Sequence, residues 1–252
     1  MTSTLQSSKW LHCPVSKPQA KQRLFCFHYS GGGGSAFNRF GKDLPDSIEV
    51  VAIQLPGREG RLFEPPFRSL TPLLEAVTAE MLPHLTDKPF LFFGHSMGAI
   101  VSFELSRHLK SKHNLEPKHL FVSGFPGAHT YTVDNPYHQQ SDPDLLNSLK
   151  EMGGTSNEIL ENEELMRLVL PTIRADFEVC ETYQYAEGVK LDCPITAFGG
   201  WQDEMLSEQG MNAWQELTDG ACEVLMFEGG HFFLFDEAAH QTIMKKIVAC
   251  SA

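Results

Sequence analysis

The sequence predicts one α/β domain, in which helices cover both faces of a mostly parallel central sheet. Short, largely apolar runs at residues 24–27, 48–53 and 90–93 alternate with segments of helical apolar spacing. Parallel strands have this continuous apolar character because helices bury them on both sides. The chain has 252 residues, 42% of them hydrophobic, so it can form a full-sized core without disulfide or metal staples.

The first half of the chain alternates regularly between the two kinds of element. We expect strands at residues 24–27, 48–53, 90–93 and 120–122, with helices at 73–85 and from about 98 to 109. Pro83 disturbs the last turn of the first of these helices. Each apolar run stops at glycine, proline or polar residues, which is typical of strand ends in such a sheet.

The alternation stops between residues 125 and 188, where no strand-like run occurs. An Asp-Pro pair at 142–143 predicts the start of one helix. We expect further helices at 161–170 and 172–183, separated by Pro171. This insertion is roughly sixty residues long, which is typical of a functional lid, so we predict a lid at about 125–190. Strands then resume at 194–198 and 223–227, with helices around 211–217 and 238–248.

Composition narrows the possible classes of protein. The formal net charge is −12, so the chain has no general means of binding a nucleic-acid backbone. We find no signal peptide and no apolar run long enough to span a membrane. The six cysteines form no C-x-x-C pair, and we expect them to be reduced. The sequence therefore predicts a cytoplasmic protein without nucleic-acid or membrane partners.

The clearest chemical signal is the G-H-S-M-G motif at residues 94–98, which lies between an apolar strand and a helix. A serine at such a reversal has a strained backbone, and the small residues Gly94 and Gly98 avoid clashes around it. The turn directs the Ser96 hydroxyl away from the sheet, at the N-terminus of a helix that favours negative charge. We predict that Ser96 is a nucleophile.

A nucleophilic serine needs a histidine as base and an acid that orients it. In this fold class the acid follows the serine along the chain, and the histidine follows the acid. His231 follows the last strand on a glycine-rich loop and is the predicted base. Asp203 follows the strand at 194–198 and is the predicted acid, with Asp134 as the alternative after the preceding strand. We expect Asp176 to pair with nearby Arg174.

The glycine run at residues 31–34 has more than one interpretation. Gly31, Gly33 and Ala36 satisfy the dinucleotide pattern G-x-G-x-x-A, but the next strand ends at Gln54 instead of the acidic residue that this pattern requires. A loop that presents a backbone N–H toward Ser96 fits better. With the N–H of Met97, it would form a two-donor oxyanion hole. A plain turn is the third possibility.

Neither a metal nor a cofactor is predicted. The sequence has no H-E-x-x-H motif and no Asp and His cluster at metal-ligand spacing. A phosphate-binding G-K-[ST] motif is missing as well, so the glycine run is not a P-loop.

Taken together, six motifs resemble the type II thioesterases. These are F-H-Y-S-G-G-G at 27–33, L-P-G-R-E at 55–59, G-H-S-M-G at 94–98, M-G-G-T at 152–155, R-A-D at 174–176 and G-G-H-F at 229–232. Members of this family are free-standing α/β-hydrolases that serve polyketide and non-ribosomal peptide synthetases, and the medium-chain fatty acid synthase thioesterase is related to them. The resemblance starts at about Leu24. It implies a thioesterase domain at 23–252 and leaves residues 1–22 as a loose N-terminal extension.

The resemblance also implies an activity, a partner and a set of site residues. The activity is hydrolysis of acyl groups from the phosphopantetheine arm of an acyl or peptidyl carrier protein, for editing or release. The implied residues are the nucleophile Ser96, the acid Asp203, the base His231 and the oxyanion donors Ser30 and Met97. The family commonly has P-H-A-G-G where residues 28–32 are H-Y-S-G-G, so the entrance near Tyr29 differs in shape. We expect a monomer.

Three questions stay open at this point. The apolar sides of the insertion helices, at Leu145, Leu149, Met152, Leu165, Met166 and Val169, either cover the acyl chain or pack on the sheet. Arg58, Arg61 and Arg68 form either a docking patch for an acidic carrier protein or a solvated loop. The same residues are also compatible with a carboxylesterase, or with a non-catalytic module that binds carrier proteins.

Overall fold

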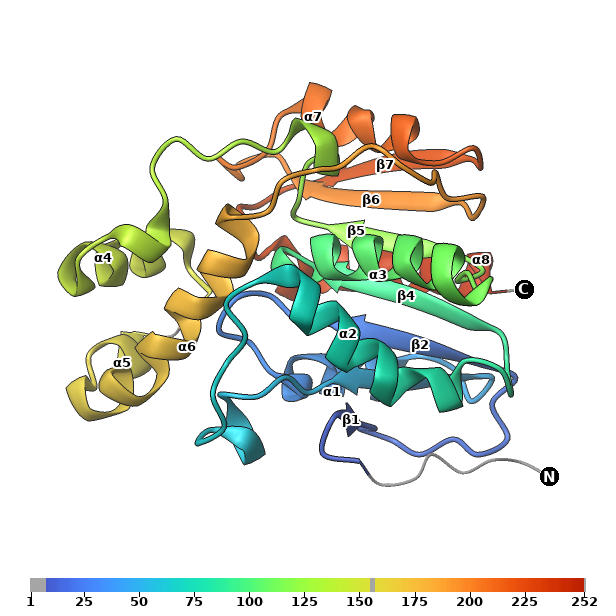
Figure 1. Cartoon of the computed structure of the whole chain (residues 1–252), viewed down its shortest axis with the longest axis horizontal. Coiled ribbons are helices and arrows are strands. Elements are labelled where there is room, and N and C mark those ends of the chain that lie inside the picture. The colour runs from blue at the N-terminus through green and yellow to red at the C-terminus, as the bar shows by residue number, and fades with distance from the viewer. Residues whose placement is uncertain (1–7, 155–156, 252) are drawn as a thin grey trace.

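The computed structural model describes residues 8–154 and 157–251 and contains one central sheet with helices on both faces (Figure 1). Its seven strands lie in the order β1-β3-β2-β4-β5-β6-β7. Every neighbouring pair is parallel except β1 and β3. The predicted α/β-hydrolase architecture, with its mostly parallel sheet, is therefore confirmed.

The inner strands are buried along their whole length, as the apolar runs within them predict. These strands are β2 (Gln22–Phe27), β3 (Ile48–Ile53), β4 (Phe90–His95), β5 (Leu120–Ser123) and β6 (Ile195–Gly200). The last strand, β7 (Cys222–Phe227), is half-buried because it forms an edge of the sheet.

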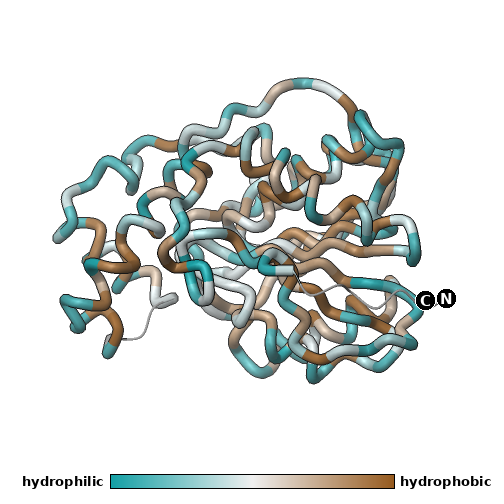
Figure 2. Tube along the Cα trace, turned by 60° about the horizontal axis from the view of Figure 1, so that its bottom comes forward, coloured by the Kyte–Doolittle hydropathy of each residue, from teal (hydrophilic) through white to brown (hydrophobic). Residues whose placement is uncertain are grey.

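Helices on each side of the sheet bury alternate residues of the strands. In β2, Phe25 faces one core and Leu24 the other. Helices α2 (Leu70–Met81), α3 (Met97–His113) and α7 (Glu208–Asn212) contribute to the first core, and α1 (Asn38–Asp43) and α8 (Glu237–Cys250) to the second. Figure 2 shows hydrophobic stretches along the strands. Within the described ranges, no helix is both long and apolar enough to cross a membrane.

The predicted helical insertion is present between β5 and β6 and projects beyond one end of the sheet (Figure 1). It contains α4 (Asp142–Met152), α5 (Asn157–Leu160) and α6 (Glu163–Glu181), which share a small core of their own. We expected Pro171 to separate two helices, and this is wrong, because α6 continues through it. A long apolar face packs α6 into place, which offsets the hydrogen bond that proline removes.

The expectation of a loose N-terminal extension is wrong for residues 8–22. Strand β1 (Leu11–His12) pairs antiparallel with β3, and Trp10 joins the core. The Arg61 guanidinium lies 4.0 Å from the centre of the Trp10 ring, an arrangement that favours a cation–π contact. A two-residue strand is too short to show any periodicity in the sequence, so this edge of the sheet could not be predicted.

Candidate active site

Ser96 lies at the tight turn between β4 and α3. Its φ of 55° and ψ of −118° are unusual for a residue with a side chain, so the backbone here is strained. A Cβ atom at Gly94 would overlap the carbonyl group of Gly98, and one at Gly98 would overlap the carbonyl of Phe27. Both glycines of the motif are therefore required by close main-chain packing around Ser96.

His231 and Asp203 form a buried pair on the loops that follow β7 and β6. His231 Nδ1 lies 2.7 Å from Asp203 Oδ2, and the two residues are only 7% and 6% exposed. The other Asp203 oxygen accepts a hydrogen bond from the Met205 N–H at 3.0 Å, which fixes the carboxylate. The alternative acid, Asp134, is exposed, and the acid partner of His231 is Asp203.

One cavity brings three of the predicted catalytic and oxyanion-hole residues together, while Asp203 and Met97 are not among the residues that line it. Ser30, Ser96 and His231 line it, and its volume of about 30 Å³ is the space of a single water molecule. No Ser96–His231 hydrogen bond is present among the described residues, which is common for a nucleophile and base before substrate binds. The other lining residues are Tyr29, Leu149, Met152, Gly154, Phe177, Met205 and Phe232.

Among the residues considered for substrate contact, we predicted Tyr29 at the entrance and Leu145, Leu149 and Met152 of the insertion, and the structure divides these four into two groups. Tyr29, Leu149 and Met152 line the cavity. Leu145 lies elsewhere, fully buried in the insertion's own core. Phe177 also lines the cavity and was not predicted, although it belongs to the same kind of apolar helical stripe. Thr155 of the M-G-G-T motif lies outside the described residues.

A second buried histidine lies beside His231 and was not predicted to matter. The ring centres of His95 and His231 are 5.1 Å apart, and His95 Nδ1 lies 2.9 Å from Ser123 Oγ. Burial, followed by the nearby His231, lowers the pKa of His95 well below its usual value. His95 is therefore a neutral ring that adds no positive charge next to His231.

The glycine run is held by side chains of the same chain. Gly31 N–H donates to Asp176 Oδ2 at 2.8 Å, and Gly34 N–H donates to Gln54 Oε1 at 2.8 Å. The Glu59 carboxylate packs so closely on Gly33 that a Cβ atom there would overlap it. A dinucleotide pyrophosphate would need these backbone donors and would meet two carboxylates instead. The geometry therefore opposes the dinucleotide interpretation.

Two arginine predictions need correction. Arg58 and Arg61 are both buried at 5% exposure and do not form a surface patch with Arg68. Asp176 binds Arg58 and not Arg174, which pairs with Asp142 at 2.6 Å. Residues two apart on a helix point in different directions, which explains why Arg174 cannot reach Asp176.

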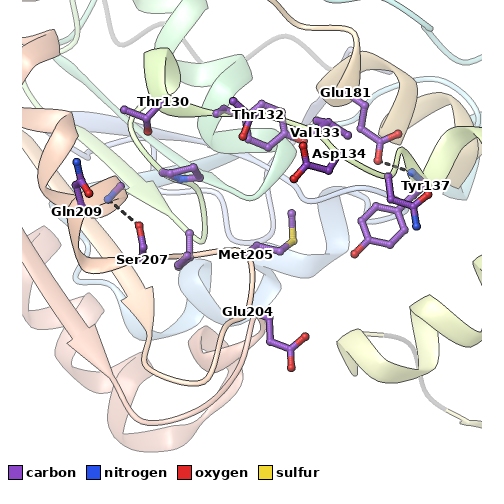
Figure 3. A pocket seen from close by; sticks show the side chains of 15 residues that line it. Thr130, Thr132, Val133, Asp134, Tyr137, Glu181, Glu204, Met205, Ser207 and Gln209 are labelled. Carbon is purple, nitrogen blue, oxygen red and sulfur yellow. Dashed lines mark hydrogen bonds between the residues drawn. The ribbon is translucent and has the colours of Figure 1, made fainter.

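A larger groove opens beside the cavity (Figure 3). It occupies about 630 Å³ between the segment that follows β5 and the loop that follows β6. Its wall is polar, and the Glu181 carboxylate accepts a hydrogen bond from Tyr137 N–H at 2.7 Å. Met205 lines both the groove and the cavity, so this one side chain lies between them.

The parallel sheet, the strained serine after β4 and the Asp–His pair after the last two strands define an α/β-hydrolase. The family model for the thioesterase domain matches residues 22–249, so the chain belongs to the thioesterase family and is a thioester hydrolase. It is similar to the gramicidin S biosynthesis protein GrsT of Aneurinibacillus migulanus, with 43% identity over 94% of this chain and 92% of that protein.

Two further comparisons bear on the type of thioesterase. The solved structure of the type II thioesterase BorB, from the borrelidin biosynthetic cluster, matches with a TM-score of 0.89 and 32% identity, covering 97% of this chain and 98% of that one. The resemblance to type II thioesterases is thus confirmed. A protein named linear gramicidin dehydrogenase LgrE, from Brevibacillus parabrevis, is 41% identical over 91% of this chain and 88% of that protein. In this chain, Asp176 already binds a backbone N–H of the glycine loop and Glu59 packs against Gly33. The loop therefore does not support a dehydrogenase function here.

Proposed function

We propose that this protein removes acyl or peptidyl groups from the phosphopantetheine arm of a carrier protein through an ester formed on Ser96. The observation that carries the proposal is the cavity in which the strained Ser96 meets the His231–Asp203 pair. The names of GrsT and BorB connect those relatives with the biosynthesis of gramicidin S and of borrelidin, which supports a substrate from such a pathway.

In the first step, His231 Nε2 takes the proton of the Ser96 hydroxyl, and Ser96 Oγ attacks the thioester carbonyl carbon. The carbonyl oxygen becomes an oxyanion, which the N–H groups of Ser30 and Met97 stabilise. As the carbon–sulfur bond breaks, His231 returns the proton to the departing pantetheine thiol. The acyl group is then esterified to Ser96.

In the second step, water replaces the serine. His231 takes a proton from water, the hydroxide attacks the ester, and the same two N–H groups stabilise the second oxyanion. The proton passes to Ser96 Oγ as the carboxylic acid leaves. Throughout, the Asp203 carboxylate accepts a hydrogen bond from the Nδ1–H group of His231, and this tautomer leaves Nε2 free to act as the base.

The substrate must displace side chains of the insertion before it can react. A cavity of about 30 Å³ has no room for an acyl chain, and Leu149, Met152 and Phe177 form its apolar wall. Movement of these side chains would open space for an apolar acyl group. We place the reaction in the cytoplasm and propose a monomer; the six free thiols support a reducing compartment.

The test is to load a peptidyl carrier domain with several acyl groups and to measure which acids are released. Wild-type protein should release acid, and Ser96→Ala should not, while a fluorophosphonate should modify Ser96. A matched oxygen ester should react more slowly than the pantetheine thioester. Faster hydrolysis of the oxygen ester would favour a carboxylesterase. Unchanged thioester hydrolysis by Ser96→Ala would overturn the mechanism.

A further inference from the structure

A buried ion pair connects the L-P-G-R-E segment to helix α6 of the insertion. Arg58 Nη1 donates to Asp176 Oδ2 at 2.6 Å, and Arg58 Nη2 donates to Asp176 Oδ1 at 2.8 Å. The two side chains are 6% and 3% exposed. This two-bond geometry between a guanidinium and a carboxylate fixes both the distance and the orientation of the partners.

The same pair also binds the main chain directly after Ser30. Asp176 Oδ2 accepts the N–H of Gly31 at 2.8 Å, and Arg58 Nη1 donates to the carbonyl of Gly32 at 3.3 Å. The loop is thus bound by the Asp176 carboxylate at one peptide group and by the Arg58 guanidinium at a neighbouring one. The N–H of Ser30, the proposed oxyanion donor, belongs to the residue immediately before this bound segment.

Helix α6 makes two further contacts with this loop. Gly31 has a φ of +77°, and a Cβ atom there would lie 2.8 Å from Cγ1 of Ile173. Only glycine combines this conformation with this close approach to α6. The Cys180 thiol, one turn beyond Asp176, interacts with the side chain of Ser30. One face of α6 therefore contacts the loop at both Ser30 and Gly31.

A gain in folding stability does not by itself explain why Arg58 and Asp176 form a buried ion pair. Removing two charges from water costs free energy that their attraction often fails to recover, and apolar residues frequently replace a buried ion pair without loss of stability. Apolar residues could not bind the peptide groups of Gly31 and Gly32, however. What this pair adds is a fixed position for the loop.

We propose that Arg58 and Asp176 are positioning residues that hold the Ser30 N–H toward the oxyanion formed at Ser96. Helix α6 is then part of the apparatus that stabilises the transition state, in addition to being a cover for the acyl group. This inference rests on the proposed function only for the role of the Ser30 N–H.

The first test is Asp176→Asn, measured with an acyl carrier substrate. Loss of a complete oxyanion donor costs ~10²–10³ in rate, so we expect a misplaced donor to lower kcat by about 10- to 100-fold. KM should change by less than about threefold, because the loop contributes little to substrate binding before charge develops. A trifluoromethyl ketone, which forms an oxyanion on serine, should lose affinity in parallel with kcat/KM.

The matched control is Asp142→Asn, which breaks the ion pair between the exposed Asp142 of α4 and Arg174, two residues before Asp176 on α6. It should leave kcat and ketone affinity near their wild-type values. Because Asp176→Asn leaves Arg58 buried without its partner, the double variant Arg58→Met, Asp176→Leu is needed as well. We expect it to fold and to show the same loss of kcat.

The outcomes separate the two proposals. The kcat of each variant is expressed per serine that reacts with a fluorophosphonate. If either folded variant then has the wild-type kcat and the wild-type affinity for the ketone, the positioning role is overturned. Proportional loss of kcat and of reactive serine would mean only unfolding, and would overturn it too. If the wild-type protein hydrolyses no carrier thioester, the proposed function fails, while the ketone affinities of the same variants still test the position of the Ser30 N–H.

Discussion

The carboxyl end of the sheet and the helical insertion both line the cavity, but they are held in place by different means. At the sheet end, main-chain packing sets the position of Ser96, since Gly94 and Gly98 have no room for a side chain. In the insertion, α4, α5 and α6 pack through a separate cluster of side chains, and the Arg58–Asp176 pair connects α6 to the glycine loop. The position of Ser96 thus depends on close main-chain packing, whereas the insertion depends on side-chain packing and on one ion pair that reaches the glycine loop.

The largest effect should come from the sheet end. Ser96→Ala should lower kcat by ~10⁴-fold or more, because no other group can form the acyl ester. Stopped assays with an acylated carrier domain would measure this, with thermal melting to show that the variant is folded. Ser111→Ala, at an exposed serine on α3, is the control and should retain full activity. Residual turnover above one hundredth of wild type would contradict a role for Ser96 as the nucleophile.

The next effect tests the acid on the neighbouring loop. Asp203→Asn should lower kcat by ~10³–10⁴-fold, because the amide no longer holds His231 in the tautomer that has a free Nε2. Asp192→Asn, at an exposed residue before β6, should have no effect on kcat. Similar rates for these two variants would mean that the 2.7 Å contact between His231 and Asp203 has no catalytic role.

Low pH should destabilise the folded protein through the buried His28 at the carboxyl end of the sheet. Burial and then the nearby Arg58 lower the pKa of His28 to about 4, from 6.5 in the unfolded chain. Between these values the unfolded state binds a proton that the folded state does not. The free energy of unfolding should therefore fall by about 3 kcal/mol for this group as the pH decreases from 6.5 to 4.

Urea titrations at several pH values would measure this loss. His28→Asn should reduce the slope of stability against pH in that window, and His113→Gln, at an exposed histidine, should leave the slope unchanged. An equal slope in wild type and His28→Asn would show that His28 does not contribute.

The smallest effect should come from the apolar cavity wall that the insertion contributes. Leu149→Ala enlarges the apolar wall of the cavity, and we expect kcat/KM to change by less than ~10-fold, in favour of bulkier acyl groups. Competition between short and branched acyl groups on one carrier domain would detect the shift, with Leu146→Ala as the control. A loss as large as that of Asp203→Asn would erase the contrast between the two regions.

Local patterns explain how much of this could be predicted from the sequence. The strand, the turn and the helix around Ser96 each have a short-range signal, as does the glycine-flanked loop of His231. The pairing of Arg58 with Asp176 spans 118 residues and has no such signal. Likewise, Leu145 and Leu149 belong to one helical stripe, and only tertiary packing decides that Leu149 faces the cavity while Leu145 does not.

Met205 separates the small cavity from the wide groove, while its own backbone N–H is bound to Asp203. Its main chain therefore binds the Asp203 carboxylate, while its flexible thioether side chain is free to contribute to the wall of both spaces. A Met205→Ala substitution would remove atoms from the wall that the two spaces share, near Ser96. The main-chain N–H at this position could still donate to Asp203.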